Sequence, residues 1–163
     1  MESQATPLAG KTPAESYTEM VQIVYNAHAN GSGRLFGGEL MKWIDTVGAV
    51  TARRHCAREV TTAAVDTLRF EAPVPVNSTV LLKGKITFTG RTSMEVRVGA
   101  YVELLSGERC RVNEAFLVFV ALDDEGIPTP VPPILPETES EKAAYEAGKQ
   151  RQALRLQRRK ERF

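Results

Sequence analysis

Cysteine is scarce in this chain, which holds only Cys56 and Cys110 among its 163 residues. Two cysteines are too few for a disulfide framework, and their separation is not the paired spacing of a zinc site. Long apolar runs are also missing, since none approaches the roughly 18 residues of a membrane span. Residues 1–11 lack the charged-then-apolar order of a signal peptide. We therefore expect a cytoplasmic protein with no membrane-spanning segment, no metal and no cofactor.

A surplus of one charge sign is absent as well. Lysine and arginine number 21 against 20 aspartates and glutamates, a formal net charge of +1, which argues against a protein that binds polyanions over its whole surface. Nucleic acid is accordingly not expected as a partner. Hydrophobic residues make up 42% of the chain and charged residues 25%, as in folded soluble proteins. A chain of this length is expected to fold around one hydrophobic core.

Proline and charge divide the chain unevenly. Five of the nine prolines lie in residues 128–136, which are predicted to form an extended strap. Beyond it, residues 149–163 carry seven cations and one anion, a local charge of +6. Good helix formers, with acids early and bases late, predict a solvated helical tail, or alternatively a tail that binds nucleic acid or an acidic partner. The predicted parts are an N-terminal extension at 1–15, a folded domain at 16–127, the strap at 128–136 and a basic helical tail at 137–163.

Strand patterns dominate the predicted folded domain. Apolar residues alternate with polar ones along 80–89 and again along 93–104, the period of two that is typical of a strand with one buried face. The tight Gly90-Arg91 connection between them predicts antiparallel neighbours. The end of the last strand, AFLVFVA, is apolar on both faces, so we expect the helix to cover one side and another subunit or the strap to cover the other. The predicted strands are 17–25, 60–70, 80–89, 93–104 and 110–121.

One helix is predicted inside the domain, at 38–55, and it is apolar nearly all round, as a buried helix is. The order is one strand, a loop, a long buried helix and then four antiparallel strands. This order fits an α+β fold of the hot-dog type, a curved antiparallel sheet wrapped around a long central helix, here followed by the helical tail. Such a sheet leaves unpaired edges, so at least a dimer is expected.

The glycine-rich segment NAHANGSGRLFGG, residues 26–38, is the first candidate for chemistry. It places Gly37 and Gly38 at the start of the buried helix, where the first N–H groups have no intrahelical partner and the macrodipole is positive. Such a helix start can accept an anion or a developing oxyanion. The alternative is that the glycines only permit tight packing, because neither phosphate-loop motif occurs in the sequence.

Asp45 is the second candidate, because it lies two turns inside a helix that is otherwise apolar. An unpaired carboxylate enclosed in such surroundings costs several kcal/mol, so a purely structural role is poorly motivated. A carboxylate that faces a cavity instead fits a general base or a nucleophile. The alternative is a structural pair with an arginine from another strand. The residues that share the face of Asp45 are Met41, Gly48, Ala49 and Ala52.

Other constellations are weaker. No G-x-S-x-G elbow occurs, and the adjacency of His55 and Cys56 at the helix end is not a dyad with a geometric reason. His28 and His55 with scattered acids do not make a metal cluster. Asp66 is expected to be an inward polar residue that caps or pairs.

Four segments together resemble one known family, the cytosolic-type acyl-CoA thioesterases of the hot-dog superfamily. They are HANGSGRLFGGELMKWIDTVGAVTARRHC, VTTAAVDTLRF, GRTSMEV and YEAGKQRQALRL. The resemblance covers roughly residues 16–156, and the spacing from Asn30 to Gly37 and Gly38 and on to Asp45 matches without insertion. It implies hydrolysis of acyl-CoA to a fatty acid and CoA, and double hot-dog dimers of which three form a hexamer.

The resemblance also implies roles for individual residues. Asp45 corresponds to the catalytic acid and Asn30 to the catalytic-loop asparagine, and the two face each other across a subunit interface. Gly37 and Gly38 would bind the thioester carbonyl at the helix start. Thr62 falls where the family has a threonine near the active site. The turn that the family uses beside the pantetheine and phosphates of CoA corresponds to Arg91, Thr92 and Ser93.

Two other functions are compatible with the predicted fold. One is a non-catalytic acyl-CoA-binding regulator, although no helix-turn-helix is visible and the basic tail is a weak substitute. The other is a hot-dog hydratase or dehydratase, which needs a histidine paired with an acid. In this chain the helix carries Asp45, and His28 lies on the loop.

Overall fold

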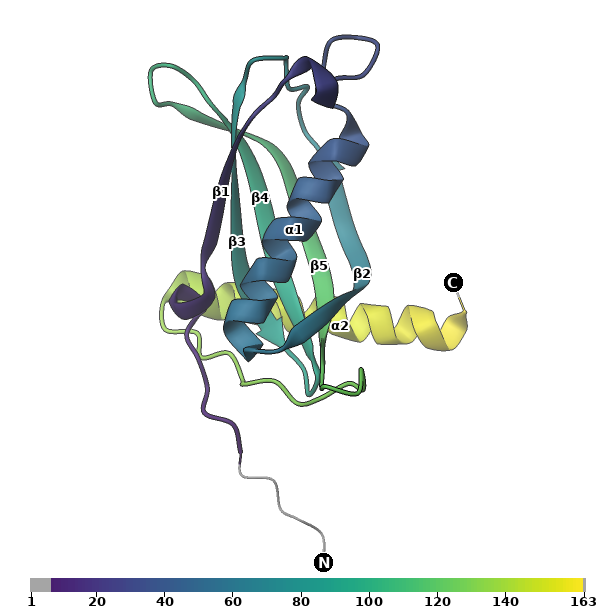
Figure 1. Ribbon diagram of the computed structural model, residues 1–163. Helices are drawn as coiled ribbons and strands as arrows, with labels where there is room; N and C mark the ends of the chain where they lie inside the picture. Colours follow the sequence, from purple (N-terminus) through teal and green to yellow (C-terminus); the bar gives the residue numbers. More distant parts are fainter. Residues whose placement is uncertain (1–6, 163) are drawn as a thin grey trace, which may run out of the picture.

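The computed structural model describes residues 7–162, so the first six residues of the predicted N-terminal extension lie outside the described part of the chain. A five-stranded sheet curves around one long helix, and a second long helix crosses its outer face (Figure 1). The strands are β1 (Thr18–Ile23), β2 (Glu59–Phe70), β3 (Thr79–Thr89), β4 (Ser93–Glu103) and β5 (Arg109–Leu122). The helices are α1 (Gly37–Cys56) and α2 (Glu139–Glu161), with short 3-10 turns η1 (Pro13–Ser16) and η2 (Asn26–His28).

The strand order is β1-β3-β4-β5-β2, and the four neighbouring pairs are antiparallel. The strands that precede and follow α1 in the sequence are therefore the two edges of the sheet. The predicted α+β hot-dog fold is confirmed by this arrangement. Each predicted strand, and the predicted central helix, agrees with the observed element to within two residues at either end.

α1 packs closely against the concave face of the sheet at two glycine positions. A Cβ atom on Gly48 of α1 would lie 2.8 Å from the ring of Phe119 on β5. A Cβ atom on Gly84 of β3 would overlap the side-chain hydroxyl of Thr51. Because only glycine fits at both positions, the depth and the position of α1 on the sheet are fixed. Its buried apolar residues include Leu40, Trp43, Ile44 and Val47.

The Pro-rich strap, residues 128–136, crosses the end of the molecule where α1 finishes (Figure 1). Its Val131 and Ile134 are buried in the hydrophobic core. The fully buried imidazole of His55 donates from Nε2 to the carbonyl oxygen of Pro132 at 2.7 Å. Burial lowers the pKa of His55 and outweighs the hydrogen bond to Pro132, which raises it. The strap is therefore tied to the last turn of the central helix.

The basic tail forms a helix on the surface, as predicted, but one side of this helix packs on the sheet, so it is only partly solvated. α2 begins after Thr138, whose hydroxyl accepts a hydrogen bond from the amide of Glu141 at 3.1 Å, and it packs across the outer side of the sheet. Gly148 is buried in this contact, because a Cβ atom there would lie 2.7 Å from Cβ of Phe88. The sequence suggested solvation because α2 has few apolar residues, but its arginines bind acids on the sheet.

Within residues 7–162 the outer side of β5 is covered by α2, a cover that the prediction of the strap or another subunit did not include. The guanidinium of Arg151 stacks on the ring of Phe116 at 3.8 Å. The strap reaches only the last residues of the strand, where the amide of Thr129 donates to the carbonyl of Ala121 at 2.9 Å. Neither α1 nor α2, nor any other helix within residues 7–162, is both long and apolar enough to cross a bilayer.

Candidate active site

Asp45 and Thr62 meet where α1 passes the edge strand β2. The hydroxyl of Thr62 donates to Oδ1 of Asp45 at 2.7 Å. No cation lies within ion-pair distance of Asp45 among residues 7–162, so the alternative of a structural pair with an arginine fails for the described chain. One oxygen of the carboxylate is held by the threonine, and the other has no hydrogen-bond partner in the described residues. The second oxygen is therefore available to take a proton.

The expected enclosure of Asp45 is wrong for the single chain, because this residue is exposed. Gly48 and Ala52 on its face are buried, whereas Met41 on the same face is 43% exposed. The reason lies in the strand order, since β2 is the edge of the sheet and nothing in residues 7–162 covers the helix beyond it. Helix composition alone does not reveal which face of a helix reaches past the edge of a sheet.

A cavity of about 370 Å³ opens beside the Asp45 carboxylate. Its walls are mostly apolar, and Asp45 is the one acid among them. This combination can hold an aliphatic group against a proton acceptor. The lining residues are Gly38, Met41, Lys42, Ile44, Asp45, Thr62, Val65, Leu68 and Leu117.

The start of α1 faces the same region. α1 begins at Gly37, and within residues 7–162 the amide of Gly38 has no hydrogen-bond acceptor. The positive end of the helix dipole and the Gly38 amide can therefore polarise a carbonyl oxygen. Seven residues separate Gly38 from Asp45, which corresponds to roughly 10 Å along a helix axis. One thioester carbonyl cannot contact both groups of the same helix.

Asn30 is held in a tight turn before α1. Its side-chain oxygen accepts hydrogen bonds from the amides of Ser32 at 2.9 Å and Arg34 at 3.3 Å, and Gly33 has the positive φ of 69° that closes the turn. The side-chain oxygen is thus fixed, and the NH₂ group of Asn30 has no partner in the described residues. A rigid donor of this kind can orient a water molecule or a carbonyl.

A single chain does not bring Asn30 to Asp45. Asn30 and Gly37 line a different cavity, of about 400 Å³, together with Phe70 of β2. Asp45 and Gly38 line the cavity described above. The candidate residues are therefore divided between two cavities at the open edge of the sheet.

The turn after β3 lies apart from Asp45. The carbonyl oxygen of Arg91 accepts the amide of Val131, and that of Thr92 accepts the amide of Ala121. Thr92 and Ser93 line a cavity of about 270 Å³ between the sheet and α2. The predicted CoA-binding turn is thus on the outer side of the sheet.

The sequence did not reveal an ion cluster beneath α2, which we call the outer-face ion cluster. Glu95 of β4 is 1% exposed and receives hydrogen bonds from Arg151 and Arg155 at 2.7–3.0 Å. Asp66 of β2 pairs with Arg155 at 2.9 Å and Arg158 at 3.5 Å, so it pairs as expected, but on the outer face beneath α2 and not inward toward α1. Burial raises the pKa of Glu95, but the arginine hydrogen bonds outweigh it and hold that pKa below its ordinary value. The sequence signal for this cluster was the spacing of Arg151, Arg155 and Arg158, which are four and three residues apart.

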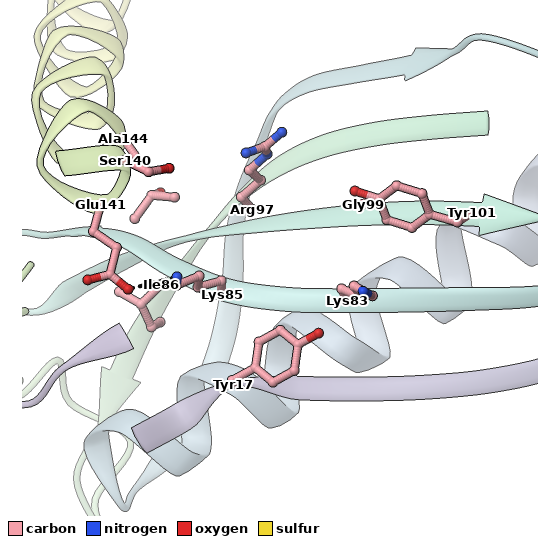
Figure 2. A pocket seen from close by; sticks show the side chains of 11 residues that line it. Tyr17, Lys83, Lys85, Ile86, Arg97, Gly99, Tyr101, Ser140, Glu141 and Ala144 are labelled. Atoms are coloured by element: carbon pink, nitrogen blue, oxygen red, sulfur yellow. Dashed lines mark ion pairs between the residues drawn. The ribbon is translucent and has the colours of Figure 1, made fainter. Parts of the chain in front are cut away.

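A further cavity of about 200 Å³ lies on the outer face beside the first turn of α2 (Figure 2). Lys85 lies 2.8 Å from Glu141, and this contact helps to lower the pKa of Glu141 to about 2. Lys83 lies 3.8 Å from Glu19. Because both lysines face acids and Asp45 is on the other side of the sheet, this cavity is not the candidate active site.

His28, His55 and Cys56 make contacts that do not involve Asp45. His55 is bound to the strap, and burial raises the pKa of the Cys56 thiol, which disfavours a reactive thiolate. His28 packs edge-on against Trp43, and its Nδ1 accepts the amide of Tyr25. Neither histidine is paired with Asp45.

Comparison with known proteins provides evidence that is independent of this geometry. Residues 32–103 match the thioesterase superfamily. An uncharacterized acyl-CoA thioester hydrolase of Bacillus subtilis, YkhA, is 41% identical over 138 residues, which are 84% of this chain and 80% of the relative. A cytosolic acyl coenzyme A thioester hydrolase of rat is 35% identical over 143 residues, 86% of this chain but only 38% of the longer relative.

Solved structures of similar proteins share the whole fold. A hexameric acyl-CoA thioesterase superposes with a TM-score of 0.89 at 38% identity, covering 93% of this chain and 97% of the other. An acyl-CoA hydrolase of Staphylococcus aureus, solved with butyryl-CoA and CoA, superposes with a TM-score of 0.88 at 34% identity, covering 93% of each chain. Alanine variants of that enzyme at an asparagine, an aspartate and a threonine were also solved, and these positions are separated by 15 and 17 residues.

The relatives and the structures agree over nearly all of the described chain. This chain belongs to the acyl-CoA thioester hydrolases of the thioesterase superfamily.

Proposed function

We propose that this protein hydrolyses acyl-CoA thioesters to a free fatty acid and CoA, with Asp45 as the general base or the nucleophile. The observation that carries the proposal is the Asp45 carboxylate, which is oriented by Thr62, has no cationic partner in the described residues and faces an apolar cavity. The similar proteins are named for this reaction, which supports the same assignment.

The spacing of the candidate residues supports their roles. Asn30, Asp45 and Thr62 are separated by 15 and 17 residues, the same separations as between the three positions replaced in the Staphylococcus aureus hydrolase. In the proposed reaction Asp45 accepts a proton from water while the water oxygen bonds to the thioester carbon. The C–S bond then breaks, and the CoA sulfur leaves as a thiolate that takes up a proton. If Asp45 is the nucleophile, its oxygen attacks first and water releases the acyl group.

The active site is proposed to be shared between two subunits. The Gly38 amide and Asp45 of one helix are roughly 10 Å apart, so one thioester cannot use both. In a symmetric dimer each helix start can instead approach the acid of the other subunit. Asn30 and the Gly37-Gly38 amides of one subunit would then polarise the carbonyl that Asp45 and Thr62 of the other attack.

The free edge of β2 is where such a dimer would form. Among residues 7–162, β2 pairs only with β5, and this strand carries exposed apolar residues that include Val65 and Phe70. Pairing this edge with a second copy would cover Asp45 and complete the apolar walls of its cavity. We propose a trimer of such dimers, supported by the hexameric state of similar thioesterases.

The remaining assignments follow from the same proposal. Arg91, Thr92 and Ser93 are proposed to bind the pantetheine and phosphates of CoA. The cytoplasm is the proposed compartment, because the rat relative is named as cytosolic. Residues 16–127 are proposed as the catalytic domain, with the strap and α2 as additions.

A panel of acyl-CoA thioesters from short to long chains, with free CoA measured by thiol release, tests this function. We expect CoA release from at least one member of the panel, with a fatty acid as the second product. Enoyl-CoA hydration without thiol release would contradict the proposal and favour a hydratase. Acyl-CoA binding without turnover of any member would favour a regulator, although the outer-face ion cluster already occupies three of the tail arginines.

A further inference from the structure

Two phenylalanine rings lie beside the two glycines that begin α1. A Cβ atom on Gly38 would lie only 2.5 Å from the ring of Phe36, and one on Gly37 would lie 3.4 Å from the ring of Phe70. Each glycine therefore has one aromatic ring as its neighbour. Phe36 is 57% exposed and Phe70 is 55% exposed. An exposed ring beside a site for an apolar ligand can contact that ligand.

The backbone of Phe36 is held on both sides, so its ring has a fixed base. Its amide donates to a carbonyl oxygen in the loop before α1 at 2.8 Å. Its own carbonyl oxygen accepts the amides of Glu39 at 3.0 Å and Leu40 at 3.1 Å. The amides of the two glycines have no acceptor in residues 7–162, so they can bind the thioester carbonyl directly beside the ring.

The two rings belong to different sides of the helix start. Gly38 lines the mostly apolar cavity beside Asp45, whereas Gly37 lines the cavity that also contains Phe70. The polar side chains of this second cavity are Asn30, Arg34 and Glu71. An aliphatic chain fits the apolar cavity better, which leaves the polar one for the sulfur side of the thioester. Phe36, the neighbour of Gly38, is therefore on the acyl side.

The Phe36 ring is close enough to meet the first carbons of an acyl chain. A carbonyl oxygen that accepts the Gly38 amide would lie about 3 Å from the amide nitrogen. The acyl carbon next to that carbonyl is two bonds from the oxygen, and the ring packs on the same glycine. A methyl branch on this carbon would compete with the ring for space, whereas a straight chain can continue into the apolar cavity.

We propose that Phe36 is a specificity-determining residue, whose ring favours acyl groups without a branch next to the thioester carbonyl. This inference rests on the proposed function, because it concerns the substrate of the same site. One methyl group that does not fit an apolar pocket lowers kcat/KM by about 10- to 200-fold. The ring also explains the glycine at position 38, since a side chain there would collide with it.

The test compares two substrates in the full-length wild type, Phe36→Ala and Phe70→Ala. One is the straight-chain acyl-CoA that the wild type hydrolyses fastest, and the other is its 2-methyl derivative, which has the same CoA part and the same chain length. For Phe36→Ala we expect the ratio of kcat/KM, branched to straight, to rise about 10-fold. Phe70→Ala is the matched control, because it removes an equally exposed ring from the other glycine. Its ratio should equal that of the wild type, whatever its overall rate.

Phe36→Leu is a second variant, which keeps an apolar side chain beside Gly38 and so preserves the packing of the helix start. It should raise the ratio by a smaller factor than Phe36→Ala, and a thermal melt verifies that each variant is folded. An unchanged ratio in the folded Phe36 variants, or an equal rise in Phe70→Ala, would overturn the inference. If the wild type releases no CoA from a straight-chain substrate of any length, the proposed function itself fails, which is a different result.

Discussion

The hydroxyl of Thr62 lies 2.7 Å from Oδ1 of Asp45, and this contact joins the central helix to the edge strand of the sheet. The threonine orients the carboxylate and leaves its second oxygen free. The pair lies at β2, an edge strand of the sheet, so the chemistry of the site depends on what covers that edge.

Replacing Asp45 with asparagine removes the proton acceptor while keeping the size of the side chain. We expect kcat for acyl-CoA hydrolysis to fall by about 10³-fold, within the range of lost acid–base groups. Because Asp45 is exposed, the midpoint of thermal unfolding should hardly move. Thiol release and a thermal melt measure the two quantities. Glu39→Gln, on the same helix but outside the cavity, is the matched control, and full activity in Asp45→Asn would remove Asp45 from the mechanism.

Replacing Thr62 with valine keeps the shape of the side chain and removes the hydrogen bond to Asp45. We expect kcat to fall about 10-fold, in line with one hydrogen bond to a charged group, with the KM little changed. Thr62→Ser should retain most of the activity, because it keeps the hydroxyl. Thr61→Val tests whether any neighbouring threonine has the same effect. If the serine and valine variants of Thr62 are equally slow, the hydroxyl is not what matters.

A mixing experiment tests whether the site is shared between subunits. Asn30→Ala and Asp45→Asn should each be nearly inactive alone. If Asn30 of one subunit serves Asp45 of the other, random reassembly of the two variants restores about one quarter of the sites, because half of the dimers are mixed and each mixed dimer has one intact site. Activity is measured after denaturation and refolding of an equimolar mixture. No recovery, with reassembly verified by mass, would place both residues in one subunit.

Replacing Glu95 with glutamine breaks the outer-face ion cluster. The loss of a buried charge that binds two arginines should reduce the free energy of unfolding by about 3–5 kcal/mol. Glu146→Gln, an exposed acid on α2, should have no measurable effect. Urea unfolding of the three proteins at neutral pH measures the difference.

The same substitution has a predicted pH dependence. The pKa of Glu95 is lower in the folded state than its ordinary value of 4.5, so the unfolded chain takes up the proton first as the pH falls. The stabilisation is complete above pH 4.5 and is lost as the pH falls through the lower, folded-state pKa. The difference in urea midpoint between wild type and Glu95→Gln should therefore shrink below pH 4.5. A difference that stays constant down to pH 3 would show that the charge of Glu95 is not its source.

Much of the fold could be predicted because its signals are local. The alternation along β3 and β4 and the apolar composition of α1 directly reflect which faces are buried. Asp45 stood out for the same reason, as an acid in an apolar helix. The resemblance put Thr62 near the active site, but its contact with Asp45 was not predicted, because a residue on a helix and one on the edge strand meet through the strand order, which is not a local property.

The exposure of Asp45 and the packing of α2 on the sheet escaped sequence reasoning for related causes. Asp45 is exposed because β2 is an edge, and an edge is defined by the absence of a neighbour. α2 looks like a solvated helix by composition, yet Arg151 and Arg155 are held by Glu95, a residue whose charged side chain suggested an outward, solvated position on β4. Burial through paired charges leaves no trace in hydrophobic periodicity.

The close contacts at Gly48 and Gly84 bear on how substrate preference can change. At each glycine the backbone of one element packs against side chains of the other, the ring of Phe119 and the side chains of Val47 and Thr51, so α1 has little room to shift over the strands. Variants that accept longer or shorter acyl tails must then arise by resizing wall side chains such as Met41 or Val65, not by shifting the scaffold. The acyl-chain preference can therefore change without moving the reactive carboxylate, which makes the depth of the pocket a separate target for redesign.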